Sequence, residues 1–273
     1  MRIINLIENT EGSRGCLFEH GLSFYIETKK HKMLLDTGAS DAFVKNADKL
    51  GINLCQVDHV VLSHGHYDHA GGVLEFVKRN QSATIWLQRT ALGEHYRKDS
   101  EVEKYIGMDK RIAELSQLRF VEEYAKLDDG ITLFANVTGR KLWPSGNLDL
   151  KLKDGDHFLQ DHFGHEQCLV IEEEGKRVLL SGCAHNGILN ILEKYRGLYG
   201  KAPDAVISGF HMMKKTGYTK EDREVVKEIA RELTKWNTTF YTGHCTGEEP
   251  FKVMKEYMGE QLVYVHSGDE VLK

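Results

Sequence analysis

His64-Gly65-His66-Tyr67-Asp68-His69 places three imidazoles and one carboxylate within six consecutive residues. The run follows the apolar segment Val57–Ser63, which predicts a buried strand, and precedes Gly71–Arg79, which predicts a helix. A single pair of histidines would say little, because histidines also cluster on exposed loops, but four donors in this order predict a metal site. The first two histidines can share one ion, and Asp68 and His69 can hold a second. Such donors suit zinc, manganese or iron.

Size and composition restrict the class of protein. The chain has 273 residues, 41% hydrophobic and 28% charged, which is enough to bury a large α/β core. No stretch approaches the roughly 18 apolar residues that a membrane helix needs, and the N-terminus lacks the features of a signal peptide. We therefore expect a cytoplasmic protein. The five cysteines share no CxxC or secreted-protein spacing, which favours free thiols over disulfides.

The formal net charge of −5 comes from Lys and Glu residues that are mixed along the chain. This pattern provides neither a basic stripe for nucleic acid nor a polybasic anchor for a membrane. We expect a small-molecule substrate, which can be phosphorylated, because bound metal ions would be the largest charges in the site.

Apolar patterning predicts strands followed by helices in each half of the chain. The predicted strands are Arg2–Ile7, Leu22–Thr28, Lys32–Asp36, Val57–Ser63, Ile131–Phe134, Gln167–Glu173, Arg177–Leu180, Asp204–Ser208, Thr238–Thr242 and Gln261–His266. The predicted helices are Asp41–Leu50, Gly71–Arg79, Asn186–Leu198, Lys220–Lys235 and Glu248–Tyr257. This order indicates one α/β domain over residues 1–273, with two sheets packed together and helices outside.

Two local features refine this picture. Asp41 is a plausible N-cap and Gly51 a plausible stop for the first helix. The charged stretch Arg89–Leu118 has the composition of an inserted helical segment, and we expect it to act as a lid over the site or as a homodimer contact.

The histidine run resembles the HxHxDH signature of the metallo-β-lactamase superfamily. Similar motifs extend along the chain in Leu34–Gly38, Leu179–Cys183 and Tyr241–His244. More narrowly, the chain is similar to a subgroup named after a dihydropterin-ribofuranosylaminobenzene-5'-phosphate synthase of methanopterin biosynthesis. The segments that carry this likeness are Glu19–Ser23, Ser63–His69, Gly182–Ile188, Gly209–His211 and Gly243–Gly247. The resemblance implies the αββα sandwich of that superfamily, with two mixed sheets and outer helices.

The resemblance also implies a set of ligands for two metal ions. The first ion would be held by His64, His66 and His185, and the second by Asp68, His69 and His244. For the third ligand of the first ion, His165 is the alternative, but His185 directly follows a strand and is the better candidate. Where most relatives have a bridging aspartate, this chain has Cys183, which is either a ligand or a small buried thiol.

Fewer sequence features point to a site role for the other residues. Asp36 ends a strand beside Thr-Gly and is expected to fix a ligand's imidazole N–H or a loop amide from outside the metal shell. His211 and His20 are each either site residues or ordinary structural histidines. The histidines with no positional argument are His31, His59, His95, His157, His162 and His266.

The function that follows is hydrolysis of a small ester or phosphodiester by hydroxide from a metal-activated water. Two divalent transition-metal ions are expected, zinc first and manganese or iron as alternatives, with Asp68 and His211 as catalytic residues. The alternatives are a metal-assisted condensation of a pterin with a ribosyl phosphate, as the resemblance implies, and a metal-bearing binding or sensing protein.

Overall fold

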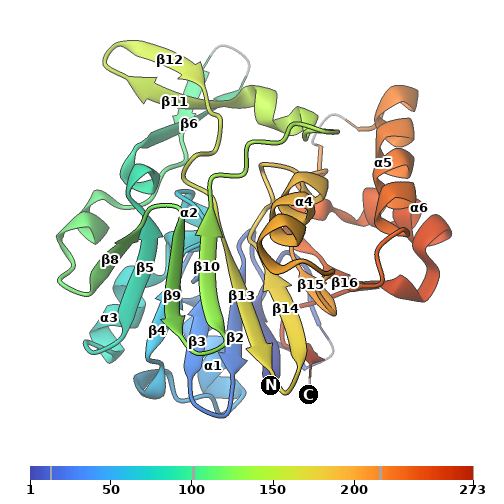
Figure 1. The fold of residues 1–273 in the computed structure, drawn as a ribbon. Coiled ribbons are helices and arrows are strands. Elements are labelled where there is room, and N and C mark those ends of the chain that lie inside the picture. Colours follow the sequence, from blue (N-terminus) through green and yellow to red (C-terminus); the bar gives the residue numbers. More distant parts are fainter. Residues whose placement is uncertain (13, 100–101, 215–216, 273) are drawn as a thin grey trace.

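The computed structural model describes residues 1–12, 14–99, 102–214 and 217–272. Within these residues two seven-stranded sheets lie face to face, and helices cover the outer face of each (Figure 1). The first sheet has the order β18 (Glu270–Leu272), β1 (Arg2–Ile7), β2 (Ser23–Glu27), β3 (Lys32–Leu35), β4 (His59–Val61), β5 (Thr84–Gln88) and β8 (Leu118–Val121). The second has the order β17 (Leu262–Tyr264), β16 (Thr239–Thr242), β15 (Ala205–Ile207), β14 (Lys176–Leu180), β13 (Gln167–Glu173), β10 (Ile131–Ala135) and β9 (Tyr124–Asp128).

Three apolar layers hold these elements together. Between the sheets, Leu35, Leu169 and Leu180 belong to one buried cluster. The outer helices of the first sheet are α1 (Ala42–Lys49), α2 (Tyr67–Ala70) and α3 (Val73–Arg79), and those of the second are α4 (Ile188–Tyr199), α5 (Lys220–Leu233) and α6 (Glu248–Met258). Phe43 packs under the first set and Tyr195 under the second. Since each large apolar side chain contributes roughly 1.5–3 kcal/mol when buried, these layers are the main stabilising term. Both sheets contain parallel and antiparallel pairs, so the predicted αββα sandwich with mixed sheets is confirmed.

Local sequence signals explain several boundaries. In the hairpin between β13 and β14, Glu174 and Gly175 have φ values of 52° and 78°, as a two-residue turn with both central residues left-handed requires. Helix α5 begins with a capping box between Thr219 and Asp222. Asp41 occupies the predicted N-cap of α1, but its side chain makes an ion pair with Lys45 instead of capping the helix.

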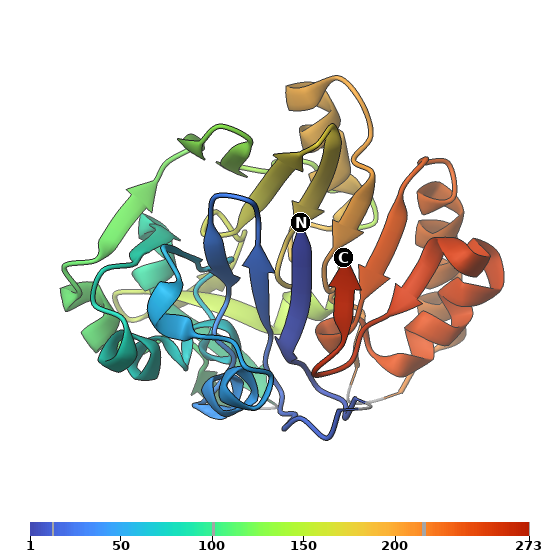
Figure 2. The same cartoon turned by 90° about the horizontal axis from the view of Figure 1, so that it is seen from below.

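Outside residues 89–118, every predicted strand and helix is present, and its ends differ from the prediction by two residues or fewer. The sequence pattern missed several strands, among them β18. This strand pairs antiparallel with β1, through Ile3 and Leu272, and brings the two ends of the chain side by side (Figure 2). None of the helices in the described ranges has the length and apolar character needed to cross a membrane.

The prediction that Arg89–Leu118 is helical is wrong. Residues 94–99 and 102–105 form strands β6 (Glu94–Asp99) and β7 (Val102–Tyr105), with short 3-10 turns at Arg89–Leu92 and Lys110–Glu114, while residues 100 and 101 lie outside the described part. The strands join a small sheet of order β12 (His157–Gln160), β11 (Leu150–Asp154), β6 and β7, which we call the cap sheet. Tyr96 on β6 packs against Tyr105 on the neighbouring strand β7 and against Phe158 on β12, two strands away, and such aromatic contacts stabilise a sheet despite the charged composition.

Candidate metal centre

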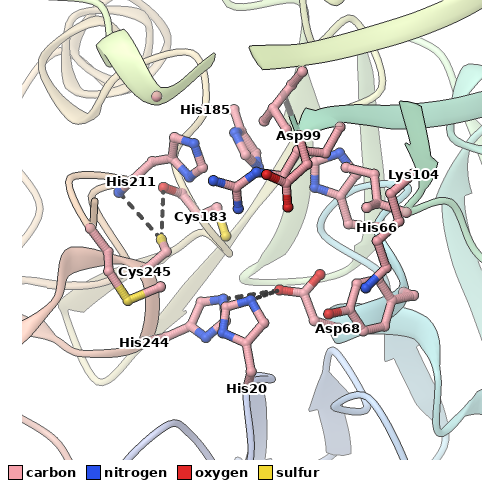
Figure 3. Close-up of a pocket in the computed structure, with 16 residues that line it drawn as sticks. His20, His66, Asp68, Asp99, Lys104, Cys183, His185, His211, His244 and Cys245 are labelled. Atoms are coloured by element: carbon pink, nitrogen blue, oxygen red, sulfur yellow. Dashed lines mark hydrogen bonds and ion pairs between the residues drawn. The ribbon is translucent and has the colours of Figure 1, made fainter. Parts of the chain in front are cut away.

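The candidate ligands gather at one edge of the sandwich, where strands end. The run His64–His69 follows β4, and His185, His211 and His244 follow β14, β15 and β16. Because β14, β15 and β16 are parallel, their carboxyl ends meet at the same edge. Residues far apart in the sequence therefore face a common cavity (Figure 3).

His64, His66 and His185 form a group that we call the first cluster. Nε2 of His64 lies 3.0 Å from Nδ1 of His66, and the His185 ring centre lies 4.8 and 4.9 Å from the other two ring centres. Burial, followed by the neighbouring imidazoles, lowers the pKa of all three rings well below its ordinary value. The rings are therefore neutral, which is the state that donates an electron pair to a metal.

Hydrogen bonds from outside orient two rings of the first cluster. Nδ1–H of His185 donates to Oδ1 of Asn147 at 2.9 Å, and Nε2 of His185 is buried with no partner among the described residues. Nδ1 of His64 lies 2.9 Å from the hydroxyl of Ser63, which itself donates to Asp36. Each ring thus turns its Nε2 away from its outer partner, as metal-binding histidines do.

Asp68, His69, His244 and Cys183 form the second cluster. Nε2 of His69 lies 3.2 Å from both Nε2 of His244 and Sγ of Cys183. Oδ2 of Asp68 lies 3.6 Å from His69 Nε2 and 3.4 Å from His244 Nε2. For tetrahedral metal–nitrogen bonds of about 2.0–2.1 Å, neighbouring donor atoms lie about 3.3–3.4 Å apart. The distances from His69 to Cys183 and His244, and from Asp68 to the two imidazoles, are therefore close to those between neighbouring donors of a tetrahedral metal ion.

The second cluster also has outer partners. Nδ1–H of His69 donates to Oδ2 of Asp36 at 2.7 Å, and Nδ1–H of His244 donates to Oδ1 of Asn9 at 2.8 Å. Asp36 is fully buried and also accepts from the backbone N–H of Ser63 at 2.7 Å. The contacts predicted for Asp36, to an imidazole N–H and a loop amide, are both present.

Electrostatics differ between the clusters. Although burial acts to lower it, the carboxylates of Asp36 and Asp68 raise the pKa of His69 to about 9. Burial acts to raise the pKa of Asp68, but His69 and His244 hold it below its ordinary value. Burial also raises the pKa of the Cys183 thiol well above its usual range. A cation bound among these donors would reverse these directions for His69 and Cys183, because both would have to lose a proton.

The structure places His165 beside the first cluster but engages both of its ring nitrogens elsewhere. Nδ1 accepts the backbone N–H of Gly65 at 3.0 Å, and Nε2–H donates to Asp161 at 3.1 Å. Asp161 also accepts from His95, which is almost fully buried. The sequence pattern missed His95, because the segment around it was expected to be helical, and it missed Asn147 and Asn9, which no motif marks.

The other two candidate histidines, His211 and His20, lie beside the clusters. His211 follows β15, has a φ of 47°, lies 4.1 Å from His185 between ring centres and lines the cavity. His20 lies 3.4 Å from Asp68 and stacks on His244 (Figure 3). By contrast, His31 is held by Asp58 and Asp128, away from both clusters, as expected for a structural histidine.

A cavity of about 250 Å³ opens onto both clusters. Its walls come from the strand-end loops on one side and from the cap sheet on the other. The cap sheet contributes Arg97, Asp99, Lys104 and Leu150, and Ile106 lies directly after β7. The cavity is therefore suited to a small molecule that touches the cap sheet and the clusters together.

Comparison with known proteins agrees with this geometry. Residues 17–232 match the model of the metallo-β-lactamase superfamily, and the chain belongs to that superfamily. The crystal structure of Tm1679, described as a metal-dependent hydrolase of the β-lactamase superfamily, is similar at a TM-score of 0.83 and 31% identity, covering 100% of this chain and 99% of that chain. With its His/Asp clusters, the chain is a metal-dependent hydrolase of this fold.

Two proteins of Methanocaldococcus jannaschii are similar at 26% identity. One is the protein MJ0448, with 96% of each chain covered. The other is the 7,8-dihydropterin-6-methyl-4-(β-D-ribofuranosyl)-aminobenzene-5'-phosphate synthase, with 98% of this chain and 95% of that protein covered. The subgroup resemblance seen in the sequence is thus confirmed over nearly the full length.

Proposed function

We propose that the protein hydrolyses a small phosphodiester or ester at a site that holds two divalent transition-metal ions, one in each cluster. The observation that carries the proposal is the 3.2–3.6 Å spacing of donor atoms around His69 and His244 in the second cluster, beside three neutral imidazoles in the first. When bound, two such cations lower the pKa of a shared water and polarise an ester or phosphoryl oxygen.

The ligand assignment follows from which nitrogens are unengaged. We assign His185 as the third ligand of the first cluster. Its Nε2 has no partner among the described residues, whereas both ring nitrogens of His165 are engaged in hydrogen bonds. We assign Cys183 as a further donor in the second cluster, because its sulfur lies 3.2 Å from His69 Nε2. A donor set that includes imidazole nitrogens and a thiol sulfur favours zinc over manganese.

Asp68 and His211 are the proposed catalytic residues. The Asp68 carboxylate faces the cavity between His20 and His244 and can orient the attacking water. His211 lines the cavity in a left-handed backbone conformation, which costs free energy and is typical of functional positions. From there its ring can protonate the leaving group or stabilise a developing oxyanion.

The cap sheet supports a substrate with an anionic group. Arg97 on β6 is directly opposite Lys104 on β7, and both side chains line the cavity. Neither forms an ion pair with any residue in the described ranges. Like charges directly opposite each other destabilise a strand pair, so a function that needs two cations here explains their presence better than folding does. A phosphodiester therefore fits better than a neutral ester.

A second candidate is the condensation chemistry of the synthase relative, which the full-length similarity favours. A pterin and a ribosyl phosphate would use the same clusters and the same cationic pair. The two candidates differ in whether the protein acts on a simple diester with water alone.

The test is a screen of protein reconstituted with zinc, manganese or iron against aryl phosphodiesters, phosphomonoesters, carboxylic esters and lactones, with elemental analysis of each preparation. We expect about two ions per chain and the highest kcat/KM on a phosphodiester. Arg97→Gln should raise KM for the diester but not for a neutral ester, and Lys98→Gln, on the exposed face of the same strand, should change neither.

Three results would contradict the proposal. A metal content below one ion per chain after reconstitution would refute the dinuclear site. Higher kcat/KM on neutral esters would refute the role of the cationic pair. Turnover only with a pterin and a ribosyl phosphate together would establish the second candidate instead.

A further inference from the structure

A second group of polar residues is buried behind the first cluster. His66, His95, Asp161 and His165 are 4%, 1%, 3% and 2% exposed, and they lie close enough for one donor atom of each to be within 4.8 Å of the others. They come from three segments: the metal-binding run, strand β6 of the cap sheet, and the loop that follows β12.

Hydrogen-bond accounting within this group leaves two nitrogens without a partner. Oδ2 of Asp161 accepts from Nδ1–H of His95 at 3.0 Å and from Nε2–H of His165 at 3.1 Å. The remaining nitrogen of His165 accepts the Gly65 N–H. Nε2 of His66 and Nε2 of His95 are buried with no partner among the described residues. Each such buried polar atom costs free energy and calls for an explanation.

The two unpartnered nitrogens have complementary character. Because His95 carries its proton on Nδ1, which donates to Asp161, its Nε2 holds a lone pair. Nδ1 of His66 faces His64 Nε2 in the first cluster, so a ring that uses Nδ1 as a ligand carries its proton on Nε2. One nitrogen is thus a donor and the other an acceptor.

We propose that His95 and Asp161 are positioning residues for the first metal site, in which His95 Nε2 accepts the His66 Nε2–H, directly or through a bridging water, and Asp161 fixes His95. This inference rests on the proposed function, since it requires a metal ion in the first cluster. The resulting sequence of contacts runs from the metal ligand through a second imidazole to a buried carboxylate. Outer partners of this kind orient a ligand ring and raise its basicity.

The cap sheet is also joined to the metal-binding run through the backbone. The N–H of Tyr67 donates to the carbonyl of Ile106 at 2.9 Å, and the N–H of Ile106 donates to the carbonyl of His95 at 2.8 Å. His95 and Arg97 are two residues apart on β6, so they lie on the same face of the strand. The cap sheet therefore both completes the first metal site and supplies a cation to the substrate cavity.

The same four residues could instead hold a third metal ion. The contacts of Asp161 to His95 and His165, at 3.0 and 3.1 Å, have hydrogen-bond lengths, and the Gly65 amide occupies the second nitrogen of His165. A hydrogen-bonded network therefore accounts for every polar atom except the complementary pair, and we treat a third ion as an outcome of the test.

The test uses cobalt(II) as the probe in the full-length wild type, His95→Phe and His95→Gln, with His59→Phe as the control. His59 is a partly buried ring on β4 that contacts Trp86 and lies outside both clusters. We expect His95→Phe to weaken binding of one of two cobalt ions by about 10–100-fold and to change the visible spectrum of that ion alone. His95→Gln, whose side-chain oxygen can still accept, should recover most of the affinity, and His59→Phe should match the wild type.

Asp161→Asn, which keeps the side-chain shape, gives a second variant should His95→Phe fail to fold, and it should weaken the same ion in the same direction. Wild-type affinity and spectrum for both ions in His95→Phe or in Asp161→Asn would overturn the positioning role. Three cobalt ions in the wild type and two in the variants would show that the group is itself a metal site. No stoichiometric cobalt in the wild type would instead refute the proposed function, whatever the variants do.

Discussion

The two clusters lie side by side but are built in different ways. The first cluster contains three neutral imidazoles, and its outer partners include the uncharged side chains of Ser63 and Asn147. The second cluster contains a carboxylate and a thiol, and the buried carboxylate of Asp36 stands directly behind His69. Because a cation is stabilised by nearby negative charge, we expect the second cluster to hold its ion more tightly. The first cluster depends more on loops and on the cap sheet for its geometry.

The largest expected effect concerns the first cluster. His185→Ala should reduce its metal affinity by more than the roughly 100-fold that loss of an outer partner can cause, because it removes a ligand. His165→Ala should keep two ions per chain, because both nitrogens of His165 are engaged outside the cluster. The measurement is metal content and zinc affinity by competition with a chelator.

These two variants control for each other, since both remove a buried imidazole near His64 and His66. If His165→Ala lost the ion and His185→Ala kept it, the third ligand would be His165. Loss of both ions in His185→Ala would show that the clusters are not independent, and the comparison between them would fail.

An intermediate effect is expected from the outer partners. Asp36→Asn should weaken zinc binding in the second cluster by about 10–100-fold, because it removes the charge that His69 donates to. Asn147→Ala should weaken the first cluster by about tenfold, near the lower end of that range, because the lost acceptor is neutral. Zinc titrations of the two purified variants measure both. Equal losses of zinc affinity in the two variants would mean that a charged hydrogen-bond acceptor for the ligand histidine has no greater effect than a neutral one.

The sequence-based predictions were more accurate for residues next to the strands of the sandwich than for residues that depend on the cap sheet. The run His64–His69 and the residues Asp36, Cys183 and His244 follow shortly after strands that the apolar pattern predicts, so pattern and resemblance located them together. The outer contact predicted for Asp36 is also present.

The cap sheet could not be predicted in the same way. Its strands β6 and β7 are rich in charged residues. Strand β6 pairs with β11, and its Tyr96 contacts Phe158, so both stabilising partners are distant in the sequence. Charged composition therefore suggested helix where tertiary pairing produces sheet. The roles of His95, Asp161 and Asn147 depend on that sheet and its loops, and for this reason they were missed or left as structural.

The smallest expected effect concerns His31, which lies outside both clusters. Like His69 in the protein without metal, it has carboxylate neighbours that raise its pKa. His31 is a more exposed example, with Nδ1 at 2.7 Å from Asp58 and Nε2 at 2.8 Å from Asp128. Burial acts to lower its pKa, but hydrogen bonds from its ring to Asp128 and Asp58 raise it above its ordinary value.

A histidine whose pKa is higher in the folded than in the unfolded protein stabilises the fold when it is protonated. This contribution is fully present below the unfolded pKa of about 6.5 and is lost as the pH rises through the raised folded value. We therefore expect His31→Gln to lower the Tm at about pH 6 by about 2 °C or less, since both carboxylates are partly exposed and screened, and to have no effect at about pH 9. His157→Gln, at an exposed position on β12, is the matched control. A Tm difference for His31→Gln that is the same at both pH values would show that the ring acts through packing, and the analogy with His69 would then be lost.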